Sequence, residues 1–514
     1  MKKARNLTVI SIILNIYFFL IFCIYPLYVD DGYYNIGIAK IEFLYSISAI
    51  TFFLLLITKI LQVIKNPQKT LKSYNWNQIS ITERLLYTYM LIIIVSYLIS
   101  PFKANILWGS DGWYLGTIPL LLMCSLVIFL IHNWKEPRFI GYGALIVSGF
   151  VFILGICHRF SFYPIRIEPT KYSEFISTLG NINWFCGYLS VISPIGVGLY
   201  VLQERKKDKY NWQQYLLLLY VFISFAIGFC QGSDSYFIWI TALFATLLMI
   251  SIKNTNRLKK YLLTVSLWGL AGQFIRIINY IFPERYNYDI STLNSTIDTN
   301  ITLVIALIAV LLYFSIRKDK EIKPNYQKLI RSIVVMFTIA ISITYIIASI
   351  YNTTIGISVL SNNSIFLWNE SWGSGRGAIF KESITLFDKM NFIQKLFGVG
   401  ADGFYAFAYS FPENVINFNN EYSNLALTNA HCEILTNLIN LGIIGTITYI
   451  GILLSFFIRC IKHGEQQPLL YISALCTICY FSNNLVSFAQ VLNIPFLFIL
   501  IGISESYIKN MKQA

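Results

Sequence analysis

Apolar runs of about 18 to 25 residues recur along the whole chain, and short polar stretches separate them. A helix of about 20 residues crosses a hydrocarbon core of about 30 Å and satisfies its own backbone hydrogen bonds in lipid. The short alternating segments of a membrane barrel are absent. The pattern predicts an all-α integral membrane protein with about 12 to 14 transmembrane helices. The expected spans lie near residues 7–29, 38–62, 84–100, 114–132, 139–157, 179–202, 213–230, 235–252, 261–281, 299–316, 329–350, 430–458, 469–485 and 489–508.

The composition strengthens this interpretation. Of the 514 residues, 56% are hydrophobic and 12% are charged, whereas a soluble domain usually carries about 25% charged residues. The net charge of +14 is better explained by basic cytoplasmic loops than by nucleic-acid binding. The nine cysteines fall mostly inside apolar runs, which favours buried thiols over a disulfide framework.

Lys and Arg gather in alternate connections between the expected spans, as in Lys65–Lys72, Arg205–Lys209, Lys253–Lys260 and Arg317–Lys323. Cytoplasmic loops carry an excess of these residues. We therefore expect a multi-pass protein of the cytoplasmic membrane with both termini cytoplasmic. The basic segment Met1–Arg5 lacks a following cleavage site and is expected to precede an uncleaved first span.

One connection, 351–428, is far longer than the others and is expected outside the membrane. Loops longer than about 15 residues are uncommon unless they have a function or are disordered. Within it, 378–397 has apolar residues at helical spacing, which predicts an amphipathic helix on the membrane or on the bundle. The chain thus divides into spans at 1–350, a large extracytoplasmic loop at 351–428, and further spans at 429–514.

Arg376 stands in this loop within the sequence Ser-Gly-Arg-Gly. A guanidinium is permanently charged and can form a fork of hydrogen bonds with a diphosphate, and flanking glycines let a bulky head group approach the backbone. A solvated surface arginine is the alternative explanation.

His431 precedes an apolar run at the outer boundary of the membrane. A neutral imidazole there can take a proton from a sugar hydroxyl, and the positive end of a helix dipole disfavours the imidazolium. A capping or core histidine is the alternative. Glu433 is either an orienting or binding partner or an acid of the first helical turn.

A second polar cluster, Asn181 and Asn183, begins the span near 179–202. Two asparagines in an apolar context bind saccharide or phosphate oxygens, or they join helices. Basic residues that interrupt the charge trend on the expected outer side suggest an anionic ligand. These are Arg159, Arg166, Lys171, Arg276 and Arg285.

The order of motifs resembles the O-antigen ligase and polymerase superfamily of membrane glycosyltransferases. The motifs are Gly180–Asn183, Ser374–Gly377, Gly398–Phe404, Asn429–Leu435 and Gly442–Gly445, and the ligase-like region covers about residues 170–460. The resemblance implies that a saccharide is transferred from undecaprenyl diphosphate to a hydroxyl of a saccharide, lipid or protein, without metal or other cofactor.

The same resemblance implies that His431 is the general base and that Arg376 binds the leaving diphosphate. A second arginine usually assists, and Arg159, Arg166 and Arg276 compete for that role. The chain departs from the family at 109–116, where an arginine is often found, and at Ser233–Ser235, where a Ser-Arg pair is common.

Two other functions remain open. Asp30 and Asp31 follow the first expected span, and paired acids in such a place hold a divalent cation in some glycosyltransferases, although a solvated turn explains them as well. A flippase or transporter for lipid-linked oligosaccharides is the non-enzymatic alternative, but charged residues inside the spans are sparse. Polymerase and ligase are not separated by the motifs. The bias toward Ile, Asn, Lys and Tyr suggests an AT-rich bacterial genome and a cell without an outer membrane. Such a cell favours a polymerase of capsule or cell-surface polysaccharide over a lipopolysaccharide ligase.

Overall fold

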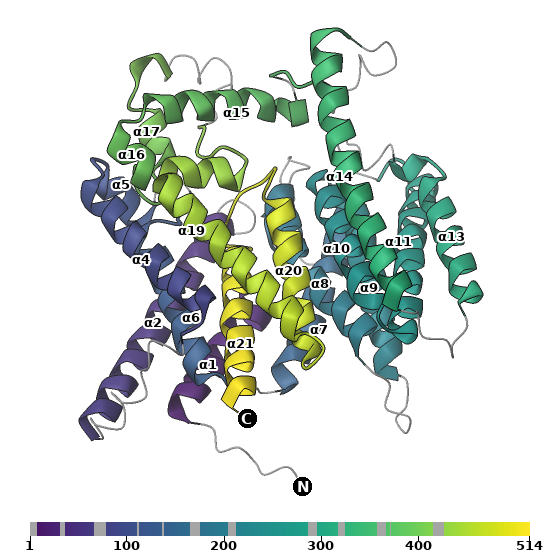
Figure 1. Ribbon diagram of the computed structural model, residues 1–514, viewed down its shortest axis with the longest axis horizontal. Helices are drawn as coiled ribbons and strands as arrows, with labels where there is room; N and C mark the ends of the chain where they lie inside the picture. The colour runs from purple at the N-terminus through teal and green to yellow at the C-terminus, as the bar shows by residue number, and fades with distance from the viewer. Residues whose placement is uncertain are drawn as a thin grey trace.

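The computed structural model describes residues 8–30, 36–65, 79–109, 113–135, 138–164, 175–203, 212–285, 296–316, 324–356, 366–370, 372–414 and 426–513. Almost all secondary structure in these ranges is helical (Figure 1). Within the described ranges, ten helices are long and apolar enough to cross a membrane, and four shorter apolar helices accompany them. The chain is therefore a multi-pass helical membrane protein, as the hydrophobic pattern predicts.

Each of the fourteen expected spans overlaps one of these helices. They are α1 (Val9–Phe19, continued by a π-turn and a 3-10 turn to Leu27), α2 (Ile36–Lys65), α4 (Ile81–Ile99), α6 (Thr117–Asn133), α7 (Arg138–Arg159), α8 (Ile182–Leu202), α9 (Trp212–Cys230), α10 (Ser235–Ser251), α11 (Thr255–Ile281), α13 (Ile301–Ser315), α14 (Pro324–Thr354), α19 (Glu433–His463), α20 (Pro468–Asn483) and α21 (Ile494–Gln513). The remaining elements are α5 (Lys103–Trp108), α15 (Trp372–Lys389), α16 (Phe392–Phe397), α17 (Phe404–Ala408) and the short strands β1 (Phe175–Ile176) and β2 (Gly180–Asn181).

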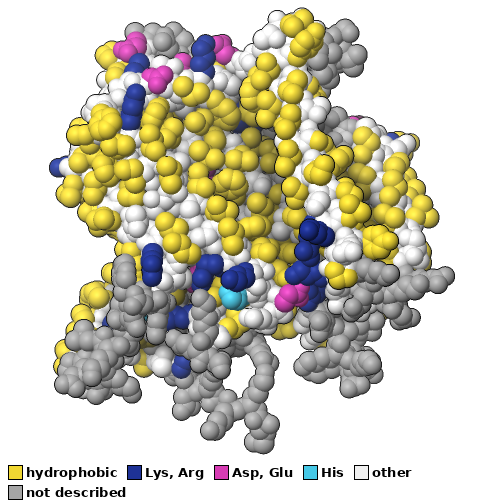
Figure 2. Space-filling model, viewed as in Figure 1, with side chains coloured by type: hydrophobic (Ala, Val, Ile, Leu, Met, Phe, Trp, Pro, Cys, Tyr) yellow, Lys and Arg dark blue, Asp and Glu magenta, His cyan; other side chains and the backbone are white. Residues whose placement is uncertain are grey.

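The bundle has two different ends (Figure 1). α15, α16 and α17 cover one end, here called the loop end, whereas α1 begins and α21 ends at the opposite end, here called the termini end. Side chains on the visible face are mostly apolar between the two ends, and the described charged residues gather toward each end (Figure 2). Such an apolar belt suits a helical bundle whose outer face meets lipid tails.

The amphipathic helix expected at 378–397 exists, but its bounds were wrong. α15 begins earlier, at Trp372, and ends at Lys389. Asn391 then starts α16, because its side chain accepts a hydrogen bond from the Gln394 N–H while the Gln394 side chain accepts one from the Asn391 N–H. This reciprocal cap starts a new helix and interrupts the old one.

The described helices of the long loop are packed against a small core of their own. Buried apolar residues from α15, α17, α19 and the segments beside these helices form it: Ile379, Leu386, Met390, Val399, Phe404, Phe407, Ala408, Leu427, Ala430 and Ile439.

Two glycine motifs of the sequence explain how this loop joins the bundle. Val399 and Gly400 donate backbone hydrogen bonds to Ile439 O and Asn440 O of α19, at 3.0 and 2.9 Å. α19 bends at Gly442, whose φ of 68° is in the left-handed region that favours glycine. A Cβ on Gly398 would lie 2.2 Å from Asn440 O. Glycine is thus required on both sides of this close backbone contact.

Candidate functional site

The first turns of α8 and α10 meet at the loop end. The Asn181 side chain caps α8 by accepting a hydrogen bond from the Asn183 N–H at 2.8 Å. Ser233 Oγ donates to Asn183 Oδ1 at 2.8 Å, and Ser235 Oγ donates to Cys186 Sγ at 3.2 Å. Two helix N-termini, which attract anions, are therefore held side by side.

A short hairpin orients the cap of α8. β1 and β2 pair antiparallel, with Phe175 opposite Asn181. Between the strands, the Ser177 N–H donates to His158 Nδ1 at 3.0 Å, and Thr178 Oγ1 donates to Pro26 O at 2.6 Å. These bonds attach the hairpin to α7 and to the end of the first span, so that the position of Asn181 is fixed by two neighbouring helices.

Arg159, the last residue of α7, reaches the same place. Its side chain is buried, and its Nη2 donates to the carbonyl of Gln231. Gly232 has a φ of 102°, and a Cβ on it would lie 2.6 Å from Arg159 Nη2. A side chain at position 232 would therefore displace the guanidinium from the turn at 231–235.

Arg376 approaches this turn from the first turn of α15. Its Nη1 donates to Gly373 O at 2.8 Å, while its buried Nε has no hydrogen-bond partner in the described part of the chain. Burial lowers the pKa of the guanidinium, and the neighbouring carboxylate of Asp234 raises it. Arg376 thus keeps a half-buried cation with an unused donor close to the start of α10.

His431 lies two residues before α19 in a tight turn. Its φ is 47°, and Asn429 Oδ1 accepts a hydrogen bond from its backbone N–H at 2.8 Å. Non-glycine residues with positive φ are uncommon and often mark functional sites. The imidazole stands edge-on to the ring of Phe488, with 5.4 Å between ring centroids. No described residue forms a hydrogen bond with either ring nitrogen.

The surroundings keep this imidazole neutral. Burial lowers the pKa of His431 to about 4, and the nearby positive charge of Arg376 contributes to the shift. At neutral pH the ring therefore has an unprotonated nitrogen that can accept a proton. From the sequence we expect the helix dipole to favour the neutral ring, whereas burial and Arg376 are the causes in the structure.

Glu433 is already bonded within the bundle. Its Oε1 accepts from Tyr449 OH at 2.6 Å and from Tyr480 OH at 2.8 Å, and its Oε2 accepts from Asn484 Nδ2 at 2.8 Å. Its backbone N–H donates to Asn484 O at 2.9 Å. Glu433 thus attaches the start of α19 to the end of α20, and direct substrate binding by its carboxylate stays a prediction.

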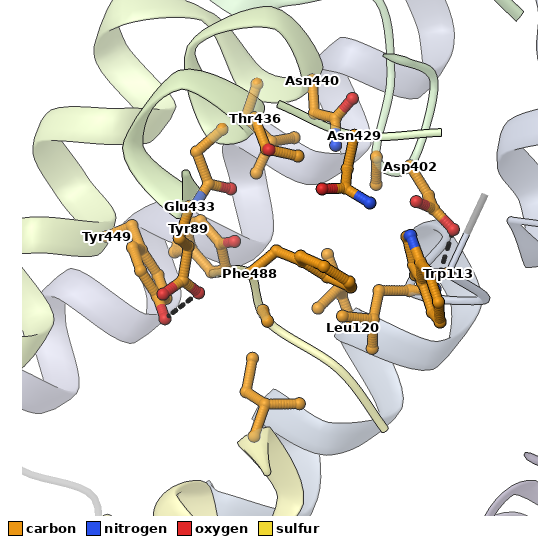
Figure 3. A pocket seen from close by; sticks show the side chains of 16 residues that line it. Tyr89, Trp113, Leu120, Asp402, Asn429, Glu433, Thr436, Asn440, Tyr449 and Phe488 are labelled. Atoms are coloured by element: carbon orange, nitrogen blue, oxygen red, sulfur yellow. Dashed lines mark hydrogen bonds between the residues drawn. The ribbon is translucent and has the colours of Figure 1, made fainter. Parts of the chain in front are cut away.

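A small cavity of about 40 Å³ lies beside the first turns of α19 (Figure 3). Asp402 Oδ2 accepts from the Leu115 N–H at 3.1 Å, and Trp113 Nε1 donates to Thr428 Oγ1 at 2.9 Å. The polar residues on its wall include Asp402, Asn429, Glu433, Thr436, Asn437 and Asn440.

The structure brings most of the predicted site residues to the loop end. Asn183, Arg159 and Arg376 lie at the turn of residues 231–235. Asn181 caps the adjoining helix α8, and the charge of Arg376 acts on His431.

Arg276 has a different environment. Its Nη1 donates to Asn300 Oδ1 at 2.7 Å, and the residue borders an open recess of about 720 Å³ that also contains Asp298. Nothing in the described ranges connects Arg276 to His431 or Arg376. Arg166, Lys171 and Asp31 lie outside the described residues, and the predictions made for them stay untested.

Several residues at this end were missed as candidates in the sequence. The Gln231–Ser235 turn was noticed only as a departure from a family pattern. Its signal is a run of small polar residues between two apolar spans. Asp402 follows the Gly398–Gly400 motif and has a φ of 58°. Phe488 gave no signal, because one phenylalanine among 39 carries no pattern.

Comparisons with known proteins do not identify the chain. No protein-family model matches it, and no curated protein matches it. Its function is therefore argued from the residues gathered at the loop end.

Proposed function

We propose that this protein is a membrane glycosyltransferase that moves a saccharide from undecaprenyl diphosphate to a hydroxyl acceptor at the loop end. The observation that carries the proposal is the pairing of a neutral His431, with no described partner on its ring, and a half-buried Arg376 whose buried Nε is an unused donor. One accepts a proton, and the other can bind an anionic leaving group.

The proposed reaction is a displacement at the anomeric carbon. The acceptor hydroxyl transfers its proton to the imidazole of His431, and its oxygen forms the new bond to the anomeric carbon. The bond between that carbon and the diphosphate oxygen breaks, and the electron pair leaves with the diphosphate. Arg376, Arg159 and the N-termini of α8 and α10 face the charge that develops there.

Arg159 is the best supported second arginine. It contacts the same turn that Arg376 approaches, whereas Arg276 has its own partners on α13. The sequence resemblance to O-antigen ligases and polymerases leads to the same two-arginine, one-histidine chemistry. Among its members we favour a polymerase that joins repeat units of a capsule or cell-surface polysaccharide, with the loop end extracytoplasmic and both termini cytoplasmic. A ligase or a protein oligosaccharyltransferase is the second choice.

The test is transfer by the purified protein. Undecaprenyl-diphosphate oligosaccharide, extracted from the producing cells, is incubated with the protein in lipid nanodiscs, with and without EDTA. A ladder of products that persists in EDTA supports a metal-independent polymerase. Transfer of one block to a separately supplied lipid or protein acceptor supports a ligase.

Two results would contradict the proposal. Loss of the ladder in EDTA with recovery on adding Mg²⁺ or Mn²⁺ supports the metal-dependent class instead. Movement of the lipid-linked oligosaccharide across proteoliposomes without bond formation supports a flippase. His463, at the far end of α19, offers a matched histidine control, and His463→Ala is expected to retain the wild-type ladder.

A further inference from the structure

The cavity beside α19 has a polar wall and an aromatic wall (Figure 3). Along the polar wall, Asn429, Thr436 and Asn440 come from the segment that carries His431. Opposite them stand the rings of Phe488 and Trp113, whose centroids are 4.7 Å apart. Pockets for small polar molecules commonly combine aromatic surface with a few well-placed polar groups.

Asn440 shows that the polar wall is incompletely satisfied. Its side chain is 7% exposed, and its Oδ1 has no hydrogen-bond partner in the described structure. Its backbone carbonyl, by contrast, accepts bonds from the Gly400 N–H and from Ser96 Oγ, which fix the residue in place. A buried amide without a partner destabilises a fold. The unpartnered Oδ1 of Asn440 therefore indicates a group that binds a ligand or water.

The cavity adjoins the proposed base through two shared residues. Phe488 lines the cavity and also contacts the imidazole of His431 edge-on. Asn429 lines it too, and its Oδ1 holds the His431 backbone N–H. A hydroxyl compound that enters this cavity therefore contacts Phe488 and Asn429, the two residues that also contact His431.

The charges on the wall decide which substrate fits. Asp402 and Glu433 place two carboxylates around the cavity, and these repel a diphosphate. The cations Arg159 and Arg376 lie instead at the turn of residues 231–235. A neutral, hydroxyl-rich group suits the cavity, and the anionic donor head group suits the arginines.

We propose that this cavity is the acceptor subsite and that it takes the hydroxyl-bearing edge of the acceptor saccharide. Asn437 and Asn440 bind hydroxyls there, and Trp113 packs against the sugar ring. A volume of about 40 Å³ holds two or three water molecules, so one edge of a pyranose enters by displacing water while the ring stays at the aromatic wall. The assignment rests on the proposed transferase function, since it names the acceptor of the same reaction.

Two substitutions test the subsite, Asn440→Leu and Asn437→Leu. The acceptor probe is the oligosaccharide released from the same donor by mild acid. The KM for this probe is expected to rise about tenfold or more, because a hydrogen bond to the ligand is lost. The KM for the donor is expected to stay within about twofold, as for a residue that does not touch it. The Tm of Asn440→Leu is expected not to fall, because its Oδ1 has no partner to lose.

Asn133→Leu is the matched control. Asn133 ends α6, at the end of the bundle opposite α15, and its side chain donates to Phe129 O within its own helix. This variant is expected to keep both KM values. Binding of the released oligosaccharide without donor, followed by quenching of tryptophan fluorescence, provides a second readout because Trp113 lines the cavity.

The outcomes separate the subsite from the function. Wild-type transfer with an unchanged acceptor KM in both asparagine variants overturns the subsite and leaves the transferase proposal standing. Oligosaccharide binding that both variants weaken, in a wild-type protein that transfers nothing, supports the subsite as a saccharide site and overturns the transferase. Absence of both binding and transfer overturns the two together.

Discussion

Arg459 and Arg376 show two ways in which this protein holds a half-buried guanidinium. Arg459, in the last turns of α19, donates from Nε and Nη2 to the two carboxylate oxygens of Glu505, both at 2.8 Å. Arg376 donates from Nη1 to a backbone carbonyl and keeps its Nε without a described partner. The first arrangement neutralises a charge with a protein acid. The second leaves a charge that an anionic ligand can neutralise.

Two histidines, one at each end of the bundle, differ in the same way. At the termini end, His132 Nε2 lies 2.6 Å from Glu83 Oε1, and its Nδ1 lies 2.7 Å from Lys509 Nζ. At the loop end, the ring of His431 has no described hydrogen bond and a lowered pKa. His132 and Arg459 therefore join helices at the termini end, whereas the ring of His431 and the Nε of Arg376 are available for a ligand at the loop end.

His431→Ala is expected to have the largest effect on the transfer rate, and it tests the contrast between the two histidines. Loss of a general base typically costs about 10²- to 10⁴-fold in rate, so we expect the polysaccharide ladder to disappear while the protein still inserts. The measurement is transfer rate per folded molecule, with His132→Ala as the comparison. His132→Ala is expected to lower the Tm and to retain transfer. Equal transfer by His431→Ala and wild type would remove His431 from the mechanism.

Arg376→Ala is expected to have the second largest effect on the transfer rate. Removing one electrostatic donor from a developing charge costs about 10²- to 10³-fold in rate, and we expect that loss in kcat. Arg376→Lys is expected to recover part of it, since a lysine keeps the charge but loses the fork of donors. A rise in donor KM alone, with kcat unchanged, would mean that Arg376 binds the donor without stabilising the leaving group.

The contrast between the two ends was only partly predictable from the sequence. The apolar pattern was sufficient to place fourteen apolar helices, ten of which are long enough in the described ranges to cross a membrane, because a lipid-facing helix must present apolar residues over the thickness of the bilayer whatever its neighbours are. The start of α15 was missed, because Gly373, Gly375 and Gly377 carry no helical signal. His431 and Arg376 could be named because their residue types are rare in this setting.

The choice among arginines could not be made from the sequence. Arg159 and Gln231 are 72 positions apart, and Asp402 and Leu115 are 287 apart. Only the packing of α7 and α8 with the turn at 231–235 brings Arg159 to the site. The acceptor cavity depends on contacts of the same long range, between α4, α6, the turn at Asp402 and the start of α19.

Breaking the ion pair at the termini end gives a third prediction, on stability. Arg459→Met leaves the carboxylate of Glu505 buried at 1% exposure, and loss of one partner of a buried pair costs about 3–5 kcal/mol. Because the Arg459 side chain is 16% exposed, we expect the lower end of that range. The double variant Arg459→Met/Glu505→Leu is expected to recover most of the Tm. Transfer per folded molecule should be unchanged in both variants, and a specific loss would show that this end takes part in the reaction.

The smallest expected effect is on the pH dependence of transfer, and it tests whether the two loop-end groups are coupled. The base must be unprotonated, so activity is lost as the pH falls through the pKa of His431, at about 4, and is flat at neutral pH. Arg376 disfavours the imidazolium, so Arg376→Met is expected to raise that pKa toward its ordinary value of about 6.5. The residual activity of this variant should therefore begin to fall at a higher pH than that of the wild type, whereas Arg459→Met should keep the wild-type profile. Because burial is the larger cause of the shift, the displacement should be well short of the full difference. A profile that does not move in Arg376→Met would show that the guanidinium and the imidazole act independently, and that burial alone keeps His431 neutral.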